Sequence, residues 1–239
     1  MSATALGALA TAGLLGVTHA VEPDHVAGIS ALTSEYADPR RSALVGACFS
    51  LGHAALVVAW LVGAAILLGR TEFPAVYGRI GTAAAGLLLG VLGAGLAVAG
   101  LRRALARTEH SHGDTTHSHR HVPLPLPGFD GHAHDDTTTA YLRTGLVGAL
   151  FTLSPPVSMM LFATALLPDH GAGVAALAVA TYAVAITLAM SAIGAGVGSA
   201  FARTRTRDGR LHAAAQTAAG VAVVALAGSL LLDATGLAL

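Results

Sequence analysis

The chain has 239 residues, of which 54% are hydrophobic and only 11% are charged, and its mean hydropathy is +0.68. Soluble domains carry about 25% charged residues, so this composition excludes a soluble globular protein and indicates an integral membrane protein. The formal net charge is zero, which argues against nucleic acid as a partner. The single cysteine, Cys48, excludes an internal disulfide.

Six segments of the chain are apolar over the roughly 20 residues that a helix needs to cross a membrane. They cover residues 4–33, 42–68, 79–101, 142–167, 172–201 and 212–232. We therefore expect an all-α, polytopic membrane protein with six transmembrane helices, located in the cell membrane and in contact with its lipid.

The first segment is interrupted by a polar motif, His-Ala-Val-Glu-Pro-Asp-His, at residues 19–25. Ionisable side chains at membrane depth are unfavourable by about 3 kcal/mol each even on lenient scales, so they usually mark a functional site. Pro23 cannot donate a hydrogen bond to the carbonyl of His19, four residues back, so that carbonyl must find another partner. The motif predicts a broken membrane helix with His19, Asp24 and His25 as metal ligands at the break.

The geometry of a continuous helix would keep the two histidines of this motif about 120° apart, whereas a break at Pro23 brings them together. Imidazole with carboxylate suits Ni²⁺, Co²⁺ or Zn²⁺ better than Mg²⁺ or Ca²⁺. The alternative is a helix end at the membrane interface, where polar residues are common. The role of Glu22 stays open between binding metal, relaying protons and lying in water.

The second segment contains Gly52 and His53 about a third of the way along its length. A lone histidine on an apolar helix is often a hydrogen-bonded packing residue. Beside a cluster of ligands on the preceding helix, however, we predict that His53 is an additional metal ligand.

The third connection, residues 106–139, holds seven of the twelve histidines. They are His110, His112, His117, His119, His121, His132 and His134. Short histidine-rich tracts bind metals, and the low complexity and prolines of this stretch argue against a folded domain. We predict a flexible cytoplasmic metal-binding loop; the alternative is a solvated linker.

Arginine placement predicts the orientation of the chain in the membrane. Eleven arginines fall in the first, third and fifth connections, two in the second and none in the fourth. This distribution places the odd-numbered connections in the cytoplasm and, with six spans, both termini outside.

Six spans divide into two halves of three, and halves with an odd number of spans lie in opposite orientations, as in transporters built from inverted repeats. Pro23 interrupts the first span and Pro155-Pro156 the fourth. We therefore expect a first three-helix repeat with the metal motif at residues 1–105, the histidine-rich loop at 106–139, and a second repeat at 140–239. Carbonyls and hydroxyls beside Pro155-Pro156 are expected to face the first motif.

The His-x4-Asp-His pattern of residues 19–25 resembles the signature of the nickel/cobalt transporter family. Leu51-Gly52-His53, after Phe49, is similar to the second motif of that family, and residues 148–156 resemble the proline-broken span of its six-span branch, which includes efflux proteins. The resemblance implies that His19, Asp24, His25 and His53 recognise Ni²⁺ or Co²⁺. The later acidic motifs of the eight-span importers have no match, so the metal class carries over better than the transport direction.

These observations predict a permease that moves a divalent transition metal, Ni²⁺ or Co²⁺, by alternating access at a His/Asp site. The metal is the substrate, and no permanently bound cofactor is expected. No nucleotide-binding motif is present, so transport is secondary or uses a partner chain, which nothing in the sequence indicates. The rivals are a membrane-embedded metalloenzyme and a metal sensor. The chain lacks a His-Glu-x-x-His pattern, so we expect that it is not an enzyme.

Overall fold

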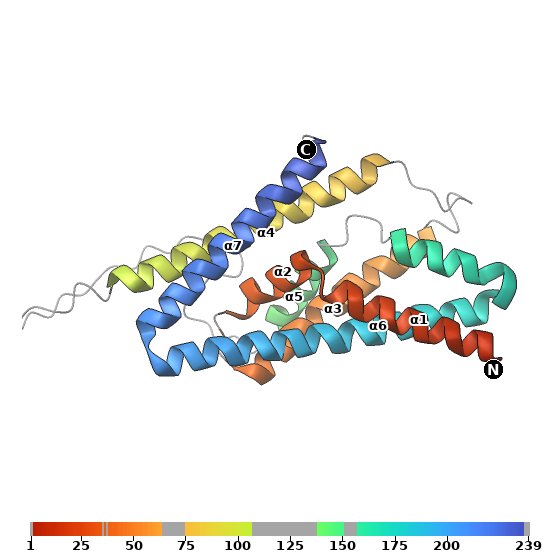
Figure 1. The fold of residues 1–239 in the computed structure, drawn as a ribbon, viewed down its shortest axis with the longest axis horizontal. Coiled ribbons are helices and arrows are strands. Elements are labelled where there is room, and N and C mark those ends of the chain that lie inside the picture. The colour runs from red at the N-terminus through yellow and green to blue at the C-terminus, as the bar shows by residue number, and fades with distance from the viewer. Residues whose placement is uncertain are drawn as a thin grey trace, which may run out of the picture.

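The computed structural model describes residues 2–34, 36, 38–63, 75–106, 138–150 and 157–236, and these residues form an all-α structure. Figure 1 shows the arrangement of the helices. They are α1 (Ala3–Ala20), α2 (Pro23–Thr33), α3 (Pro39–Gly63), α4 (Ala75–Ala106), α5 (Thr138–Leu150), α6 (Val157–Arg207) and α7 (Gly209–Thr235).

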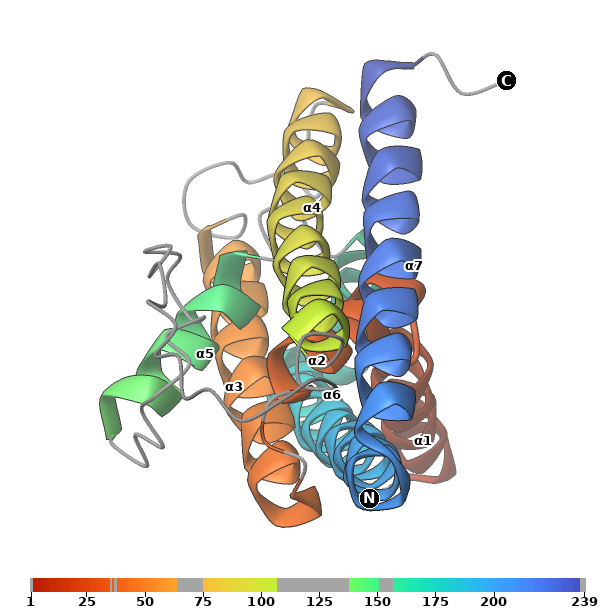
Figure 2. The same ribbon diagram turned by 90° about the vertical axis from the view of Figure 1, so that its left-hand side faces the viewer.

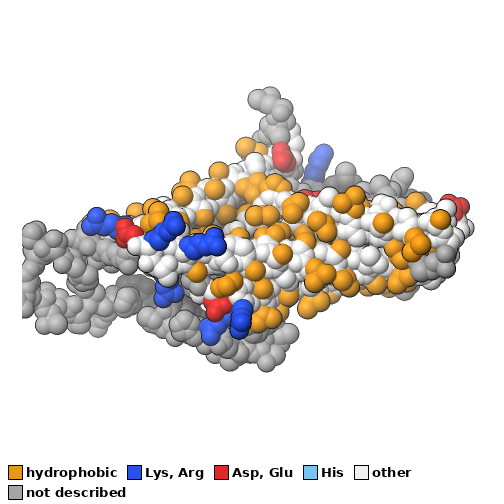
Figure 3. Space-filling model, turned by 60° about the horizontal axis from the view of Figure 1, so that its bottom comes forward, with side chains coloured by type: hydrophobic (Ala, Val, Ile, Leu, Met, Phe, Trp, Pro, Cys, Tyr) orange, Lys and Arg blue, Asp and Glu red, His pale blue; other side chains and the backbone are white. Residues whose placement is uncertain are grey.

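Five helical segments within this part of the chain are long and apolar enough to cross a membrane. They are Ala3–Ala20, Pro39–Gly63, Val76–Leu105, Ala165–Arg207 and Gly209–Thr235. Large apolar side chains cover their outer surface: Leu14 and Leu188, for example, are 64% and 67% exposed. Figure 3 shows hydrophobic side chains along the whole length of one face. The chain is therefore a multi-pass membrane protein.

The first predicted span consists of two helices. Ser2 caps α1, its hydroxyl accepting a hydrogen bond from the backbone N–H of Ala5 at 3.2 Å. α2 begins at Pro23, where the fixed φ and missing N–H of proline are favourable. The predicted break is therefore present. The His19 carbonyl finds the other partner that it was expected to need, because it accepts a hydrogen bond from the backbone N–H of Glu22 at 3.2 Å.

The fourth predicted span corresponds to α5 and the first arm of α6. Residues 151–156, with Pro155-Pro156, lie outside the described residues, as do the side chains of Ser158 and Met160. The first arm of α6 continues through Pro168 and the chain turns back at Gly171, which has a left-handed φ of 73° that favours glycine. Figure 1 shows this reversal between the two arms of α6.

The described helices pack into two groups. In the first group, which we call the main bundle, α3 and α1 pack against α6, and α5 packs against α3. In the second, α4 packs along α7 and forms what we call the α4–α7 pair. Both groups are tight: a methyl group at Gly46 would overlap the Met190 carbonyl of α6, and one at Gly220 would overlap the Ala97 amide of α4.

The short helix α2 lies between the two groups. It contacts α6 and α3 of the main bundle on one side, and both α4 and α7 on the other. Figures 1 and 2 show it between the α4–α7 pair and the helices of the main bundle. Ile29 and Ala31 of α2 are buried and join the hydrophobic cores of both groups. The polar motif at the start of α2 is thereby held near the middle of the molecule.

Candidate metal site

The break between α1 and α2 brings three histidines together. His19 lies in the last turn of α1, His25 in the first turn of α2, and His53 in α3. The ring centroids of His19 and His25 are 4.7 Å apart, those of His25 and His53 4.8 Å, and those of His19 and His53 5.1 Å. One nitrogen from each ring lies within 4.8 Å of the other two. A continuous helix would have kept the first two rings on different faces.

The spacing of two ring nitrogens matches that of two ligands on one metal ion. Nε2 of His19 and Nε2 of His53 are 3.1 Å apart. A divalent transition metal binds imidazole nitrogen at about 2.0–2.1 Å, so ligands at right angles or tetrahedral angles lie about 2.9–3.4 Å from one another. The pair therefore fits around a single ion without rearrangement.

His25 is the most isolated polar side chain of this cluster. It is only 2% exposed, and neither of its ring nitrogens has a hydrogen-bond partner. Asp24 lies beside it: one carboxylate oxygen is 3.2 Å from Nδ1 of His25 and accepts from the backbone N–H of the same residue at 2.9 Å. Because buried polar atoms are nearly always paired, the absence of a hydrogen-bond partner makes His25 a candidate ligand.

Glu22 contacts the cluster through His19. Its carboxylate oxygen is 2.9 Å from Nδ1 of His19, and its side chain is 50% exposed. A carboxylate at this position holds the proton on Nδ1 and leaves the lone pair of Nε2 facing His53. Glu22, Asp24 and His25 also form a second group whose ligand atoms lie within 4.8 Å of one another. Of the three roles open in the sequence, the hydrogen bond favours orientation of a histidine ligand.

Aromatic residues form part of the wall around the three rings. The ring of Phe49 in α3 lies 6.2 Å from that of His25, and the ring of Tyr182 in α6 lies 6.1 Å from that of His19. Both residues are buried, at 0% and 2% exposure. The sequence did not identify Tyr182, because its position depends on the close packing of α1 against α6 at Gly16 and no local motif marks it.

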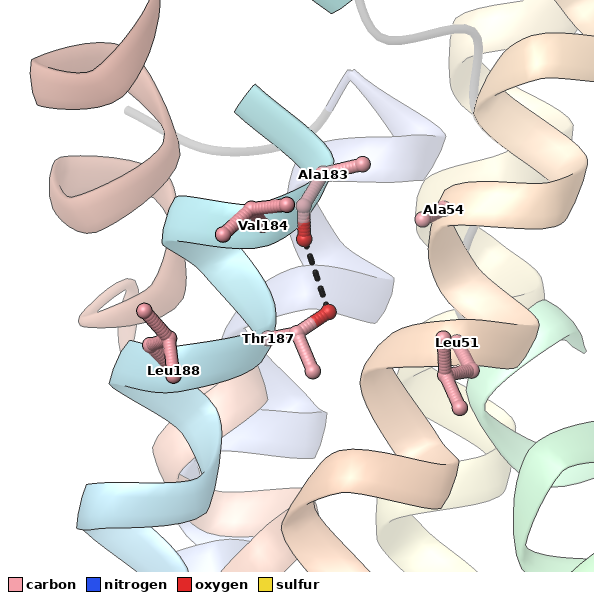
Figure 4. A pocket seen from close by; sticks show the side chains of 6 residues that line it. All are labelled: Leu51, Ala54, Ala183, Val184, Thr187 and Leu188. Carbon is pink, nitrogen blue, oxygen red and sulfur yellow. Dashed lines mark hydrogen bonds between the residues drawn. The ribbon is translucent and has the colours of Figure 1, made fainter. Parts of the chain in front are cut away.

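Two polar side chains of the apolar segments, Thr187 and Gln216, lie away from the cluster. Thr187 donates to the carbonyl of Ala183 and pairs with the hydroxyl of Ser50 at 3.0 Å. It lines an apolar groove of about 250 Å³ between α3 and α6, which Figure 4 shows. The groove is lined by Leu51, Ala54, Ala183, Val184, Thr187 and Leu188. Gln216 of α7 is buried in a separate polar cluster.

Other candidates are not tested by the geometry. The histidines at 110–134 and the polar residues Thr152 and Ser154 lie outside the described residues. Met159 of α6 is fully buried in the core.

The family model for the high-affinity nickel-transport protein matches residues 5–153, more than half of the chain. The chain belongs to the NicO family. The match contains His19, Asp24, His25 and His53, and it confirms the family resemblance seen in the sequence motifs. NicO is a family of transport proteins, in agreement with the expectation of a permease rather than an enzyme.

A curated relative of this NicO chain is the urease accessory protein UreH of Bacillus sp. (strain TB-90), which is 25% identical over 148 residues. The alignment covers 62% of this chain and 58% of the relative, so the chain spans little more than half of the relative's length. No solved structure matches the chain significantly.

Proposed function

We propose that the protein is a permease that carries Ni²⁺, or the chemically similar Co²⁺, across the membrane by alternating access at His19, Asp24, His25 and His53. The convergence of three imidazoles, with one nitrogen of each ring within 4.8 Å of the other two and the Nε2 atoms of His19 and His53 3.1 Å apart, carries the proposal. Membership of the nickel-transport family supports the choice of metal. Imidazole ligands suit Ni²⁺, whereas Mg²⁺ and Ca²⁺ prefer oxygen.

The charges around the cluster suit transient binding of a divalent cation. The N-terminus of α2 points its positive helix end toward the site, which alone would repel a cation. Glu22 at the N-cap and Asp24 in the first turn offset that partial charge. Three neutral imidazoles with a nearby carboxylate replace the water that the ion must shed, and their low total charge permits release.

Nickel flux into proteoliposomes tests this function. The wild-type protein is expected to move Ni²⁺, and His19→Ala, Asp24→Ala and His25→Ala to abolish flux at matched incorporation. Nickel binding without flux would instead favour a metalloenzyme or a sensor. The nickel and cobalt content of cells with and without the protein gives the direction, since accumulation means import and depletion means export.

The six-span, inverted-repeat architecture is part of the proposal. In it, α5 and the first arm of α6 together form the fourth span. The packing of the helices supports two related halves. The first helix of each half packs against the other half, since α1 contacts α6 and α5 contacts α3. The remaining helices pair across the halves, α3 with α6 and α4 with α7. Residues 1–105 and 140–239 then form the two repeats, and 106–139 the connecting loop.

The proposed orientation places the arginine-rich end of the protein in the cytoplasm and both termini outside. The start of α3, the end of α4 and the turn between α6 and α7 carry arginines, and antiparallel packing of these helices supports their lying at one end. Figure 3 shows arginines concentrated toward one end of a long apolar surface. Single cysteines at Ser2 and Ser118 in a Cys48→Ala background test the topology. Labelling of Ser118→Cys by an impermeant reagent in intact cells, with Ser2→Cys protected, would reverse it.

A further inference from the structure

The α4–α7 pair is joined to the main bundle at few places. The overlaps that a methyl group would cause at glycines lie within the main bundle, as at Gly46 and Gly148, or within the pair, as at Gly93 and Gly220. Among the described helices, contact between the two groups runs mainly through α2 and through the junction of α6 with α7. The helix that carries Asp24 and His25 is therefore also the link between two tightly packed groups.

A polar cluster fastens the far end of α2 to the α4–α7 pair. Gln216 of α7 is fully buried, and its amide donates a long hydrogen bond of 3.5 Å to the carbonyl of Ser34, directly after α2. Its carbonyl oxygen accepts from a guanidinium nitrogen of Arg103 in α4 at 2.5 Å. Three helices are thus joined through one amide side chain. We call Ser34, Arg103 and Gln216 the polar clamp.

His212 extends the polar clamp to the end of α6. Its Nε2 lies 3.4 Å from the same Arg103 nitrogen, and its Nδ1 lies 3.0 Å from the hydroxyl of Thr204. Since a guanidinium only donates, Nε2 accepts and Nδ1 carries the proton toward Thr204. His212 is 7% exposed, so the contact that ties α7 to α6 is buried as well.

The polar clamp lies between the metal site and the arginine-rich end. α2 runs from the site to the clamp over 11 residues, about 16 Å at the rise of an α-helix. Thr33, Ser34 and Gln216 are all 0% exposed, so this end of the bundle is packed shut around α2. The last carbonyls of a helix lack helical partners and carry partial negative charge. The Gln216 amide donates to one such carbonyl, that of Ser34, while its own oxygen accepts from the positively charged Arg103.

We infer that the polar clamp is a gate: it holds the bundle closed at the arginine-rich end and opens when metal passes between the site and that end. This inference rests on the proposed transport function. Closure satisfies the Ser34 carbonyl and the Gln216 amide without water, whereas separation of α2 from α7 exposes both to solvent. Gln216 and Arg103 therefore act on transport through the position of α2, without touching the metal.

Thiol accessibility tests the gate. Ser34→Cys in a Cys48→Ala background places a probe at the buried end of α2, and an impermeant maleimide is applied from the arginine-rich side of oriented vesicles. Gln216→Leu and Arg103→Met each remove the hydrogen bond between Arg103 and Gln216 in the closed state. The free energy needed to open the clamp therefore falls. We expect labelling to rise about tenfold in each, as for the loss of one hydrogen bond to a charged group.

The matched control is Thr217→Val, which has nearly the same shape and removes a hydroxyl bonded to Ala213 within its own helix. It is expected to leave the labelling rate unchanged. Nickel affinity is expected to stay within about threefold of wild type in Gln216→Leu, because no ligand is altered, while nickel flux falls about tenfold with the loss of the closed state. A structural role alone would lower affinity and flux together.

Several outcomes would overturn the gate. One is an unchanged labelling rate in both Gln216→Leu and Arg103→Met. Another is a rise in Thr217→Val as large as in those two variants. The third is loss of nickel binding in Gln216→Leu without a change in its labelling rate. If Ser34→Cys does not fold, hydrogen exchange of residues 29–34 in the same variants gives the same readout without a cysteine. If the wild-type protein neither binds nor moves nickel, the proposed function fails, while the accessibility result still reports whether the clamp holds α2.

Discussion

The protein buries two polar clusters that differ in how many of their polar atoms have a hydrogen-bond partner within the chain. In the polar clamp and its extension, the ring nitrogens of His212 and the amide of Gln216 each have a partner. In the candidate metal site, neither nitrogen of the buried His25 has a hydrogen-bond partner, and Nδ1 has only the contact with Asp24 at 3.2 Å. The two lie at opposite ends of α2. One cluster is complete within the chain, whereas in the proposed function the other is completed by a cation.

This difference assigns opposite roles to residues of the same type. A buried polar atom without a hydrogen-bond partner disfavours folding by about 1–3 kcal/mol. A cluster that retains such atoms lowers the stability of the fold, which is typical of functional sites. A cluster with paired atoms contributes to the fold instead. Composition alone does not distinguish His25 from His212, because both are histidines in apolar helices.

The largest contrast is expected from replacing each of these two histidines by leucine. His25→Leu should lower nickel binding and flux at least about 100-fold, beyond the 10–100-fold typical of residues that only orient ligands. It should change folding stability without metal only slightly, because neither ring nitrogen has a hydrogen-bond partner and only the 3.2 Å contact of Nδ1 with Asp24 is lost. His212→Leu should reduce stability by about 1–3 kcal/mol, because Arg103 loses an acceptor, and should leave nickel affinity nearly unchanged.

Thermal unfolding in detergent and equilibrium nickel binding measure both halves of this contrast on the same samples. Strong destabilisation by His25→Leu in the absence of metal would mean that His25 is a packing residue. Loss of nickel binding in a folded His212→Leu variant would remove the distinction between the two clusters.

Addition of nickel sharpens the comparison at the level of stability. A ligand at 100 times its Kd that binds only the folded state stabilises it by about 2.7 kcal/mol. We expect this stabilisation in wild type and in Gln216→Leu, and none in His25→Leu. The shift in unfolding temperature measures it, with Mg²⁺ as the control ion. Equal shifts with Mg²⁺, or in His25→Leu, would place the bound nickel elsewhere.

Glu22 provides a smaller test within the metal site. Glu22→Ala removes the acceptor for Nδ1 of His19, so the ring no longer has a fixed tautomer, and nickel affinity should fall about 10–100-fold. Glu22→Gln retains a carbonyl oxygen that can accept the same proton, so its affinity should lie much closer to wild type. Isothermal titration separates the two variants. Equal losses in both would show that the charge of Glu22, rather than its hydrogen bond, matters to the metal.

Local sequence chemistry was sufficient to predict the main features of the fold and the candidate site. Apolar segment length predicted the membrane helices, and the ring geometry of Pro23 predicted the break. The convergence of His53 with the first motif follows from the contact of α2 with α3, the next helix along the chain.

Features that depend on distant contacts could not be predicted in this way. The His19 carbonyl is satisfied by the N–H of Glu22, because the chain makes a tight turn before Pro23 that the proline rule does not specify. Tyr182 and Gln216 acquire their surroundings from helices more than 100 residues away. Their partners, His19, Arg103 and Ser34, follow from the packing of α6 and α7, which no sequence periodicity determines.

The smallest effect is expected from deleting residues 110–134, which removes seven histidines at once. The low complexity of their sequence does not predict a folded arrangement of ligands, whereas the candidate site has three rings within about 5 Å of one another. We therefore expect nickel flux at saturating metal to remain within a few-fold of wild type, with reduced sensitivity at low metal concentration. A flux curve against nickel concentration separates capacity from sensitivity. The deletion shortens the loop and also removes its histidines. Replacement of all seven histidines by asparagine removes the imidazoles at full loop length and is therefore the matched control. Complete loss of flux in the well-expressed asparagine variant would mean that imidazole number, rather than burial and spacing, determines where the metal binds.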